Sequence, residues 1–193
     1  MPRDQGQPPP GSAKAKVRAY SLLFDAAFFS LAQAKNSVAN RRHHCLHCLV
    51  DSAFSLEAYL NHIGPDVVLF WKNVKRLGPA DKLAVVLSQL KLDPDFRKRP
   101  FRSVVTSFRA RNMAAHASTE VLTFKHRLKK KDADFPVRPS TNLEKLCVLS
   151  VAEKVVVDIQ AVIETMHKAS GSIYSSPWWD AETEWTSVDH TPE

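Results

Sequence analysis

The chain has 193 residues, of which 44% are hydrophobic and 24% are charged, and its net charge is +7. Its 5 glycines stand far apart, which excludes the clustered glycines of a P-loop or a dinucleotide-binding turn. None lies between Gly78 and Gly171, where a sheet protein would need several tight turns, so we expect an all-α protein.

The first half of the chain divides into a lead-in and helical segments. Residues 1–12 are rich in Pro, Gly and Gln and contain almost no hydrophobic residues, as is typical of disorder. Apolar residues then recur at three- and four-residue spacing, which predicts a first helix over residues 13–35 and a second over residues 41–63. Gly64 and Pro65 should end the second helix, and residues 66–75 fit a short helix.

The second half contains three further helical segments. Pro79 and Pro100 are placed to begin helices over residues 80–90 and 100–117, since proline is favoured at the first helical position. Residues 118–140 should be a loop with a small hairpin around residues 121–126. Thr141 and Glu144 then form a capping box, which opens a long helix that Gly171 ends.

These segments predict the architecture of the whole chain. We expect a bundle of four long helices plus one short helix over residues 13–170, between disordered or extended termini. The cysteine count is odd and small, which does not suit a disulfide framework and fits a reducing cytoplasm. The most apolar stretch, residues 22–32, is too short to span a membrane, so we expect a cytoplasmic protein without a membrane partner.

The end of the predicted helix over residues 100–117 combines polar and apolar residues. On a helical wheel with about 100° per residue, Asn112 falls inside the apolar face, and Arg111 and His116 lie on its two borders. That face consists of Phe101, Val104, Val105, Phe108 and Ala115. These polar side chains either satisfy the last carbonyls of the helix or form a functional site.

Glu57 raises a similar question in the second helix. It lies near the centre of the inward apolar face, where a carboxylate is costly unless it is paired. One interpretation is a buried Glu held by an arginine or a tyrosine hydroxyl. The other is that Glu57 orients Arg111 or His116.

The segment from Arg111 to His116 resembles the signature of HEPN domains, in which an arginine and a polar residue precede a histidine. Residues 55–63 (SLEAYLNHI) and 81–83 (DKL) look like preceding HEPN segments in the same order, so the resemblance covers residues 13–170. It implies a helical bundle that forms a homodimer with both motifs facing a shared cleft. Many HEPN proteins are metal-independent endoribonucleases in toxin or defence systems with antitoxin-type protein partners, and others are non-catalytic RNA-binding or assembly modules.

A nuclease of this type would need few protein groups, because RNA carries its own nucleophile in the 2′-hydroxyl. His116 can transfer protons near neutral pH, and Arg111 can bind the phosphate oxygens. Asn112 could hold the phosphate or the imidazole, with Glu57 as a supporting residue. The expected products are a 2′,3′-cyclic phosphate and a 5′-hydroxyl, formed without a metal or other cofactor.

Basic residues flank this motif in the sequence. Residues 91–131 carry a net charge of +9, which either forms an ordinary solvated surface or binds the phosphate backbone of RNA. The candidate RNA-binding residues are Arg102, Arg109, Lys125, Arg127, Lys129, Lys130 and Lys131.

Several His and Cys residues lie close together in the second predicted helix, as in some zinc sites. Cys45 and Cys48 are three residues apart, and His44 and Cys48 are four apart, so two ligands could share a helix face. The second ligand pair usual in such sites is absent from the sequence. We therefore expect Cys45 at the edge of the core, surface histidines and no metal.

The C-terminal segment, residues 171–193, differs in charge from the rest of the chain. It holds five acidic residues and no Lys or Arg, so the preceding 170 residues carry a net charge of +12, which favours an anionic partner. It also holds Trp178, Trp179 and Trp185. The segment is either disordered, or it docks on a hydrophobic groove with its acids against a basic surface of the same or a neighbouring protomer.

Overall fold

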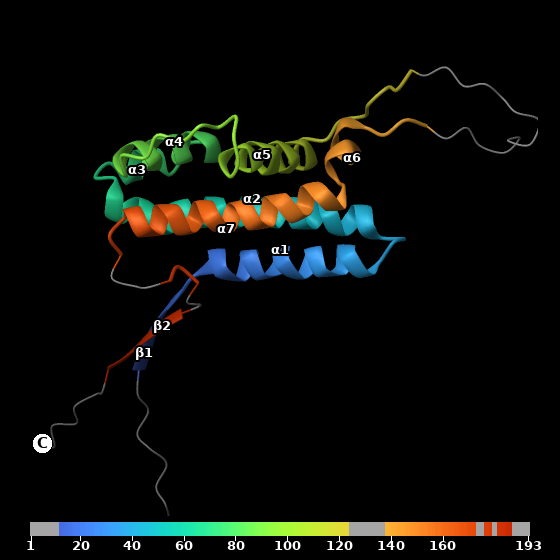
Figure 1. The fold of residues 1–193 in the computed structure, drawn as a ribbon. Helices are drawn as coiled ribbons and strands as arrows, with labels where there is room; N and C mark the ends of the chain where they lie inside the picture. Colours follow the sequence, from blue (N-terminus) through green and yellow to red (C-terminus); the bar gives the residue numbers. More distant parts are fainter. Residues whose placement is uncertain (1–11, 124–137, 173–175, 179–180, 187–193) are drawn as a thin grey trace, which may run out of the picture.

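The computed structural model describes residues 12–123, 138–172, 176–178 and 181–186. These residues form helices and one pair of short strands (Figure 1). The elements are β1 (Ser12–Val17), α1 (Ala19–Asn36), α2 (Arg41–Val67), α3 (Trp71–Val74), α4 (Pro79–Gln89), α5 (Phe101–Ala115), α6 (Asn142–Leu146), α7 (Leu149–Ala169) and β2 (Ala181–Thr186).

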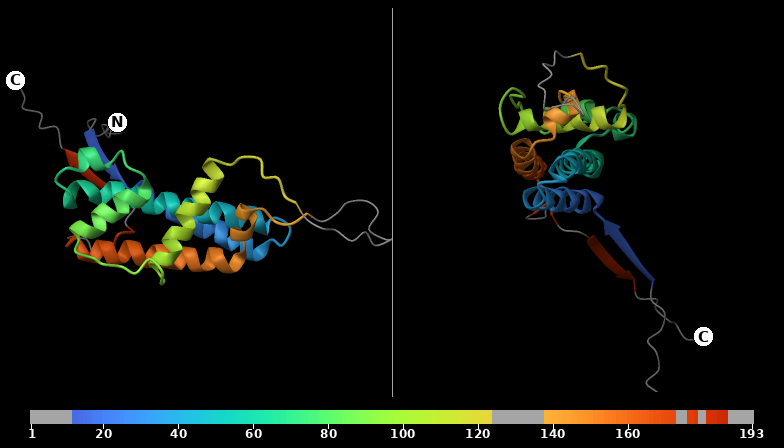
Figure 2. Two further views of the ribbon diagram at one scale, coloured as in Figure 1. Left: turned by 90° about the horizontal axis from the view of Figure 1, so that it is seen from above. Right: turned by 90° about the vertical axis from the view of Figure 1, so that its right-hand side faces the viewer.

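The helices form three layers (Figures 1 and 2). The long helices α2 and α7 lie side by side in the middle layer, α1 covers one side, and α3 to α6 cover the other. Fully buried leucines and isoleucines of α2 and α7 fill the centre, so the predicted all-α class is confirmed for the body of the protein. No helix among the described residues is long and apolar enough to cross a membrane.

The first helix begins later than predicted. Residues 12–17, expected to be helical from Ala13 onward, form β1 and pair antiparallel with β2 of the C-terminal segment. The register places Lys14 opposite Glu184 and Lys16 opposite Glu182. The prediction of a helix is therefore wrong for residues 13–17, whereas the expected extended termini agree with the two strands. Residues 1–11 and 187–193 lie outside the described part.

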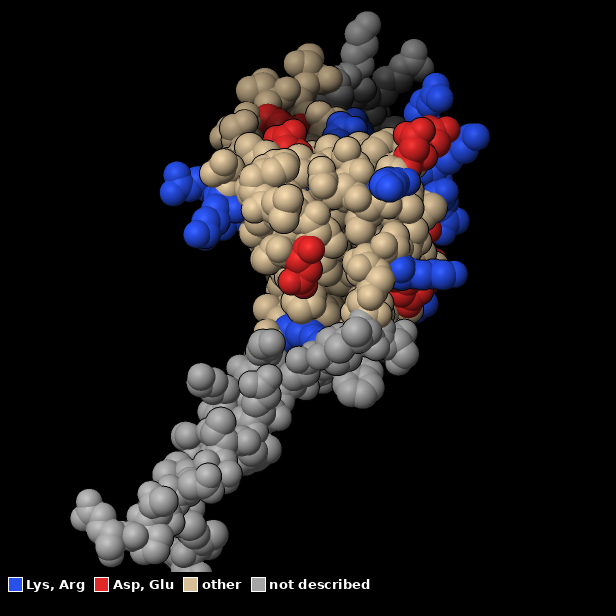
Figure 3. Space-filling model, turned by 90° about the vertical axis from the view of Figure 1, so that its left-hand side faces the viewer, with Lys and Arg blue, Asp and Glu red and all other residues tan. Residues whose placement is uncertain are grey.

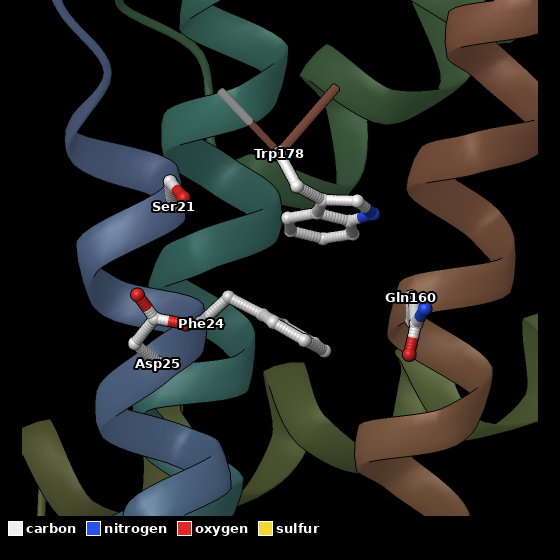
Figure 4. Close-up of a pocket in the computed structure, with 5 residues that line it drawn as sticks. All are labelled: Ser21, Phe24, Asp25, Gln160 and Trp178. Carbon is white, nitrogen blue, oxygen red and sulfur yellow. The ribbon is translucent and has the colours of Figure 1, made fainter. Parts of the chain in front are cut away.

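The C-terminal segment also docks on the helices through Trp178. Its indole stacks on Phe24 of α1 with ring centroids 4.4 Å apart, and its Nε1–H donates a hydrogen bond to Glu164 of α7 at 3.1 Å. The Tyr20 hydroxyl donates to the carbonyl of the buried Pro177. Figure 4 shows Trp178 in the pocket between α1 and α7, so the docking interpretation is supported for this tryptophan; Trp179 lies outside the described residues.

The second helix does not end at Gly64 and Pro65 as predicted. Helix α2 continues to Val67 with Pro65 inside it. A proline removes one hydrogen bond but does not prevent helix when tertiary packing holds the chain. Here the Trp71 indole packs directly on Gly64, where an added Cβ would lie 2.5 Å from the ring, so the glycine serves packing and not termination.

The predicted long helix after Thr141 is divided into two. The capping box of Thr141 and Glu144 is present, but it opens the short helix α6. The chain then turns at Cys147, whose side chain is buried, and at Val148, whose backbone is extended, before α7 begins. In the loop before α6, residues 118–123 are irregular, and the remainder of the predicted hairpin lies outside the described residues.

Helix α5 crosses the middle layer and contacts both α2 and α7 (Figure 2). An ionic clamp fixes its first turn on α7. The buried carboxylate of Asp158 accepts hydrogen bonds from Arg99 Nε at 2.7 Å and Nη2 at 2.9 Å, and from the Ser103 hydroxyl. This clamp sets the direction in which α5 carries the candidate residues at its other end.

Candidate functional site

The candidate site is built around the carboxylate of Glu57 on α2. Its Oε1 accepts a hydrogen bond from Lys82 Nζ of α4 at 3.0 Å, and its Oε2 lies 3.5 Å from Arg111 Nη2 of α5. The side chains are 19%, 6% and 24% exposed, respectively. One acidic and two basic side chains from three helices therefore meet in a largely buried ionic cluster, which pairs the inward-facing carboxylate.

Two further contacts fix the Arg111 guanidinium. Its Nη1 donates a hydrogen bond to Asn112 Oδ1 at 2.9 Å. Its central carbon lies over the Phe54 ring, 5.5 Å from the centroid, in cation–π geometry. The guanidinium is thus held in one orientation by Glu57, Asn112 and Phe54, and its partly exposed edge can still donate hydrogen bonds to an anion.

His116 has a different environment. It is the C-cap of α5, and its backbone N–H donates to the Asn112 carbonyl at 3.0 Å. Its side chain is exposed and makes no hydrogen bond or ion pair with other described residues. The predicted role in satisfying the helix end is thus filled by its backbone, and the imidazole faces solvent.

The apolar face predicted for α5 is rotated in the structure. The buried side contains the small residues Ser103, Ser107 and Ala110 together with Val104 and Phe108. Counting only large apolar residues missed the two serines, whose hydroxyls are satisfied by Asp158 and by a backbone carbonyl. Val105, Asn112 and Ala115, which were placed in or on the apolar face, are exposed.

This rotation separates the two residues of the motif. Arg111 turns toward α2, whereas His116 is exposed at the helix end, and no hydrogen bond or ion pair joins them within the described part of the chain. The structure brings Glu57, Arg111 and Asn112 together and leaves His116 apart. It also adds Lys82, which sequence reasoning missed as a site residue. The sequence did contain a signal for it, because Lys82 lies next to Leu83 and four residues before Val86 on the buried face of α4.

The candidate RNA-binding residues are placed in part. Arg102 and Arg109 are exposed on α5 and line a groove of about 410 Å³, together with Arg97 and with Leu146 of α6. The others, Lys125, Arg127, Lys129, Lys130 and Lys131, lie outside the described residues.

The candidate metal ligands Cys45 and Cys48 are buried, and so is Cys147. Burial raises the pKa of Cys48 to about 12 and of Cys147 to about 11, and it also raises the pKa of Cys45, so all three thiols are protonated near neutral pH. His43 and His47 are exposed and His44 is partly buried. Among the described residues, no group of three or more His, Cys, Asp or Glu side chains is arranged to hold a metal ion.

Comparisons with known proteins found no matching family model, no similar curated protein and no similar solved structure.

Proposed function

We propose that this chain is a metal-independent endoribonuclease of HEPN type that acts as a homodimer. The observation that carries the proposal is the fixed Arg111 guanidinium, which Glu57, Asn112 and Phe54 hold five residues before the exposed His116. A preorganised cation that keeps a partly exposed edge suits the phosphate of a cleavage transition state.

The reaction follows from the chemistry of RNA. The 2′-oxygen attacks the adjacent phosphorus, and His116 accepts the proton of that hydroxyl. Arg111 stabilises the charge on the non-bridging oxygens, while Asn112 and Glu57 hold the guanidinium. The P–O bond to the 5′-oxygen breaks, the leaving oxygen takes a proton from water, and the products are a 2′,3′-cyclic phosphate and a 5′-hydroxyl.

The separation of Arg111 and His116 supports a composite site. Within one copy, Arg111 is turned toward Glu57 of α2, and no hydrogen bond or ion pair among the described residues joins it to the exposed His116. A symmetric dimer could place His116 of one copy beside Arg111 of the other. A toxin or defence setting and an antitoxin-type partner belong to the same proposal through the resemblance.

The second candidate function is a non-catalytic RNA-binding or assembly module. The separation of Arg111 and His116 also favours this function. In addition, the ion pair between Arg111 and Glu57 can serve only to stabilise the fold. This alternative expects RNA binding without cleavage.

The deciding experiment is a cleavage assay on mixed RNA in excess EDTA with the full chain and its Arg111→Ala and His116→Ala variants. Arg76→Ala and His47→Ala, which change exposed residues elsewhere, serve as matched controls. We expect the site variants to lose at least about 100-fold in rate and the controls to match wild type. A requirement for added divalent metal, or His116→Ala cleaving at the wild-type rate, would refute the nuclease proposal.

A further inference from the structure

A hollow of about 930 Å³ lies beside α6, away from the Glu57 cluster. Four basic side chains line it, from the start of α2 and from α6: Arg41, Arg42, His43 and Lys145. Arg138 is bound at its edge through Glu144. Sequence reasoning assigned none of these residues to RNA.

Glu144 is the acidic residue among those that line this hollow, and both of its carboxylate oxygens accept hydrogen bonds. It accepts hydrogen bonds from Arg42 Nη1 at 2.8 Å, from Arg138 at 2.7 and 2.8 Å, and from the Thr141 backbone. These bonds, with Arg138 first, hold the pKa of Glu144 well below its usual range. One carboxylate thus faces two arginines, and Arg41 and Lys145 have no acidic partner within the described residues.

The ends of two long helices add positive potential at the same place. Helices α2 and α7 both begin at the α6 end of the molecule (Figure 1), and neither has an acidic residue in its first turn. Helix α2 instead begins with Arg41, Arg42, His43 and His44. Basic residues at a helix N-terminus are unfavourable because they repel the positive end of the helix dipole, and an anionic ligand would relieve that repulsion.

The positive charge continues on the other side of α6. Leu146 of α6 also borders the groove formed with Arg97, Arg102 and Arg109, so the short helix is the wall between two basic depressions. The opposite end of the molecule differs: Figure 3 shows a broad surface there that is mostly neither acidic nor basic. Both depressions beside α6 are thus lined by several basic side chains.

We propose that the residues lining these two depressions, here called the α6 surface, bind the phosphodiester backbone of single-stranded RNA. Repeated phosphates match separate cationic positions on both sides of one helix better than a single compact anion does. The choice of RNA as the ligand rests on the proposed function. The α6 surface binds the strand, and the Glu57 cluster is not part of it.

The test is fluorescence anisotropy with a labelled 20-nucleotide RNA carrying 2′-O-methyl groups, which cannot be cleaved through the 2′-hydroxyl. The variant Arg42→Ala/Lys145→Ala removes two cations from the α6 surface, and Glu144 keeps Arg138 as its partner. Lys72→Ala/Lys75→Ala removes the same charge from the exposed surface at α3, at the other end of the molecule (Figure 1). Circular dichroism checks that both variants fold.

We expect the α6-surface variant to bind roughly tenfold more weakly at 0.1 M salt and its log–log salt slope to fall by about 1.4, the value for two phosphate contacts on a single strand. The α3 variant should bind as wild type. Equal weakening of RNA binding by both variants would overturn the proposal. Polyglutamate serves as an acidic-peptide competitor, and tighter binding of polyglutamate than of RNA would also overturn it. If the full chain binds this RNA but does not cleave unmodified RNA, the nuclease proposal fails and the α6 surface stands. If the full chain cleaves unmodified RNA and the α6-surface variant binds as wild type, only the α6 surface fails.

Discussion

Lys82 donates a hydrogen bond to Glu57 at 3.0 Å although the two residues lie on different helices and only 6% of the lysine side chain is exposed. A lysine is rarely buried to that extent without a charged partner. Arg111 reaches the second oxygen of the same carboxylate, so the candidate site is also a junction of α2, α4 and α5. Stability and function can therefore be tested at one place.

Removing the carboxylate should destabilise the protein. Glu57→Gln leaves the Lys82 ammonium buried without a counter-charge. We expect this to lower the free energy of unfolding by about 2 to 3 kcal/mol. The loss should be small for a broken buried pair because the Glu57 side chain keeps some solvent contact. The double variant Glu57→Leu/Lys82→Met should recover most of this loss. Urea denaturation measures both, with the exposed Asp66→Asn as control; an unchanged Glu57→Gln would show that solvent screens the pair.

The composite-site proposal predicts complementation between inactive variants. In this proposal Arg111 of one copy works with His116 of the other. The Arg111→Ala and His116→Ala chains are unfolded, mixed and refolded together, which should restore about a quarter of wild-type activity. Half of the dimers are then mixed, and each mixed dimer has one intact site of two. Each variant refolded alone should stay inactive. Absence of any recovery, with mixed dimers demonstrated by mass spectrometry of differently tagged chains, would contradict a site shared in this way.

The sequence predicted which residues gather at the site better than it predicted how they face. Glu57 stood out because a carboxylate in an apolar stripe needs a partner, and the structure supplies Lys82 and Arg111. The orientation of α5 was predicted wrongly because Ser103 and Ser107 are small enough to be buried and are hydrogen-bonded there. The Ser103 hydroxyl is satisfied by Asp158 of α7, a tertiary contact that helical periodicity does not contain.

The same distinction applies to the fold. Periodicity located the long helices, since burial of one helix face imposes a three- and four-residue spacing. It did not reveal that Gly64 accommodates the Trp71 indole or that residues 12–17 pair with the C-terminal segment, because both depend on residues distant in the chain. The capping box at Thr141 was predicted correctly, but the break at Cys147 was not, because burial of that thiol has no local sequence signal.

The docked C-terminal segment should contribute to stability through Trp178. Trp178→Ala removes the ring stacked on Phe24 and opens that part of the core, which we expect to cost about 2 kcal/mol, less than a fully buried tryptophan because the indole is only partly covered. Phe29→Ala, an exposed aromatic of α1, should change stability by no more than about 0.5 kcal/mol. Thermal melts of both variants check this, and equal melting temperatures would contradict docking of the tryptophan in solution.

The buried thiols should make the protein less stable as the solution becomes alkaline. Burial raises the pKa of Cys48 to about 12, whereas an unfolded cysteine ionises near 8.5. Above about pH 8.5 the unfolded state therefore binds fewer protons than the folded state, so the free energy of unfolding falls with rising pH, by about 2 kcal/mol for Cys48 at pH 10. Cys48→Ala should lose correspondingly less stability than wild type between pH 8 and 10 in urea titrations. Parallel curves for the two proteins would show that the folded thiol titrates normally, and rapid reaction of the native protein with Ellman's reagent at pH 8 would show that it is accessible.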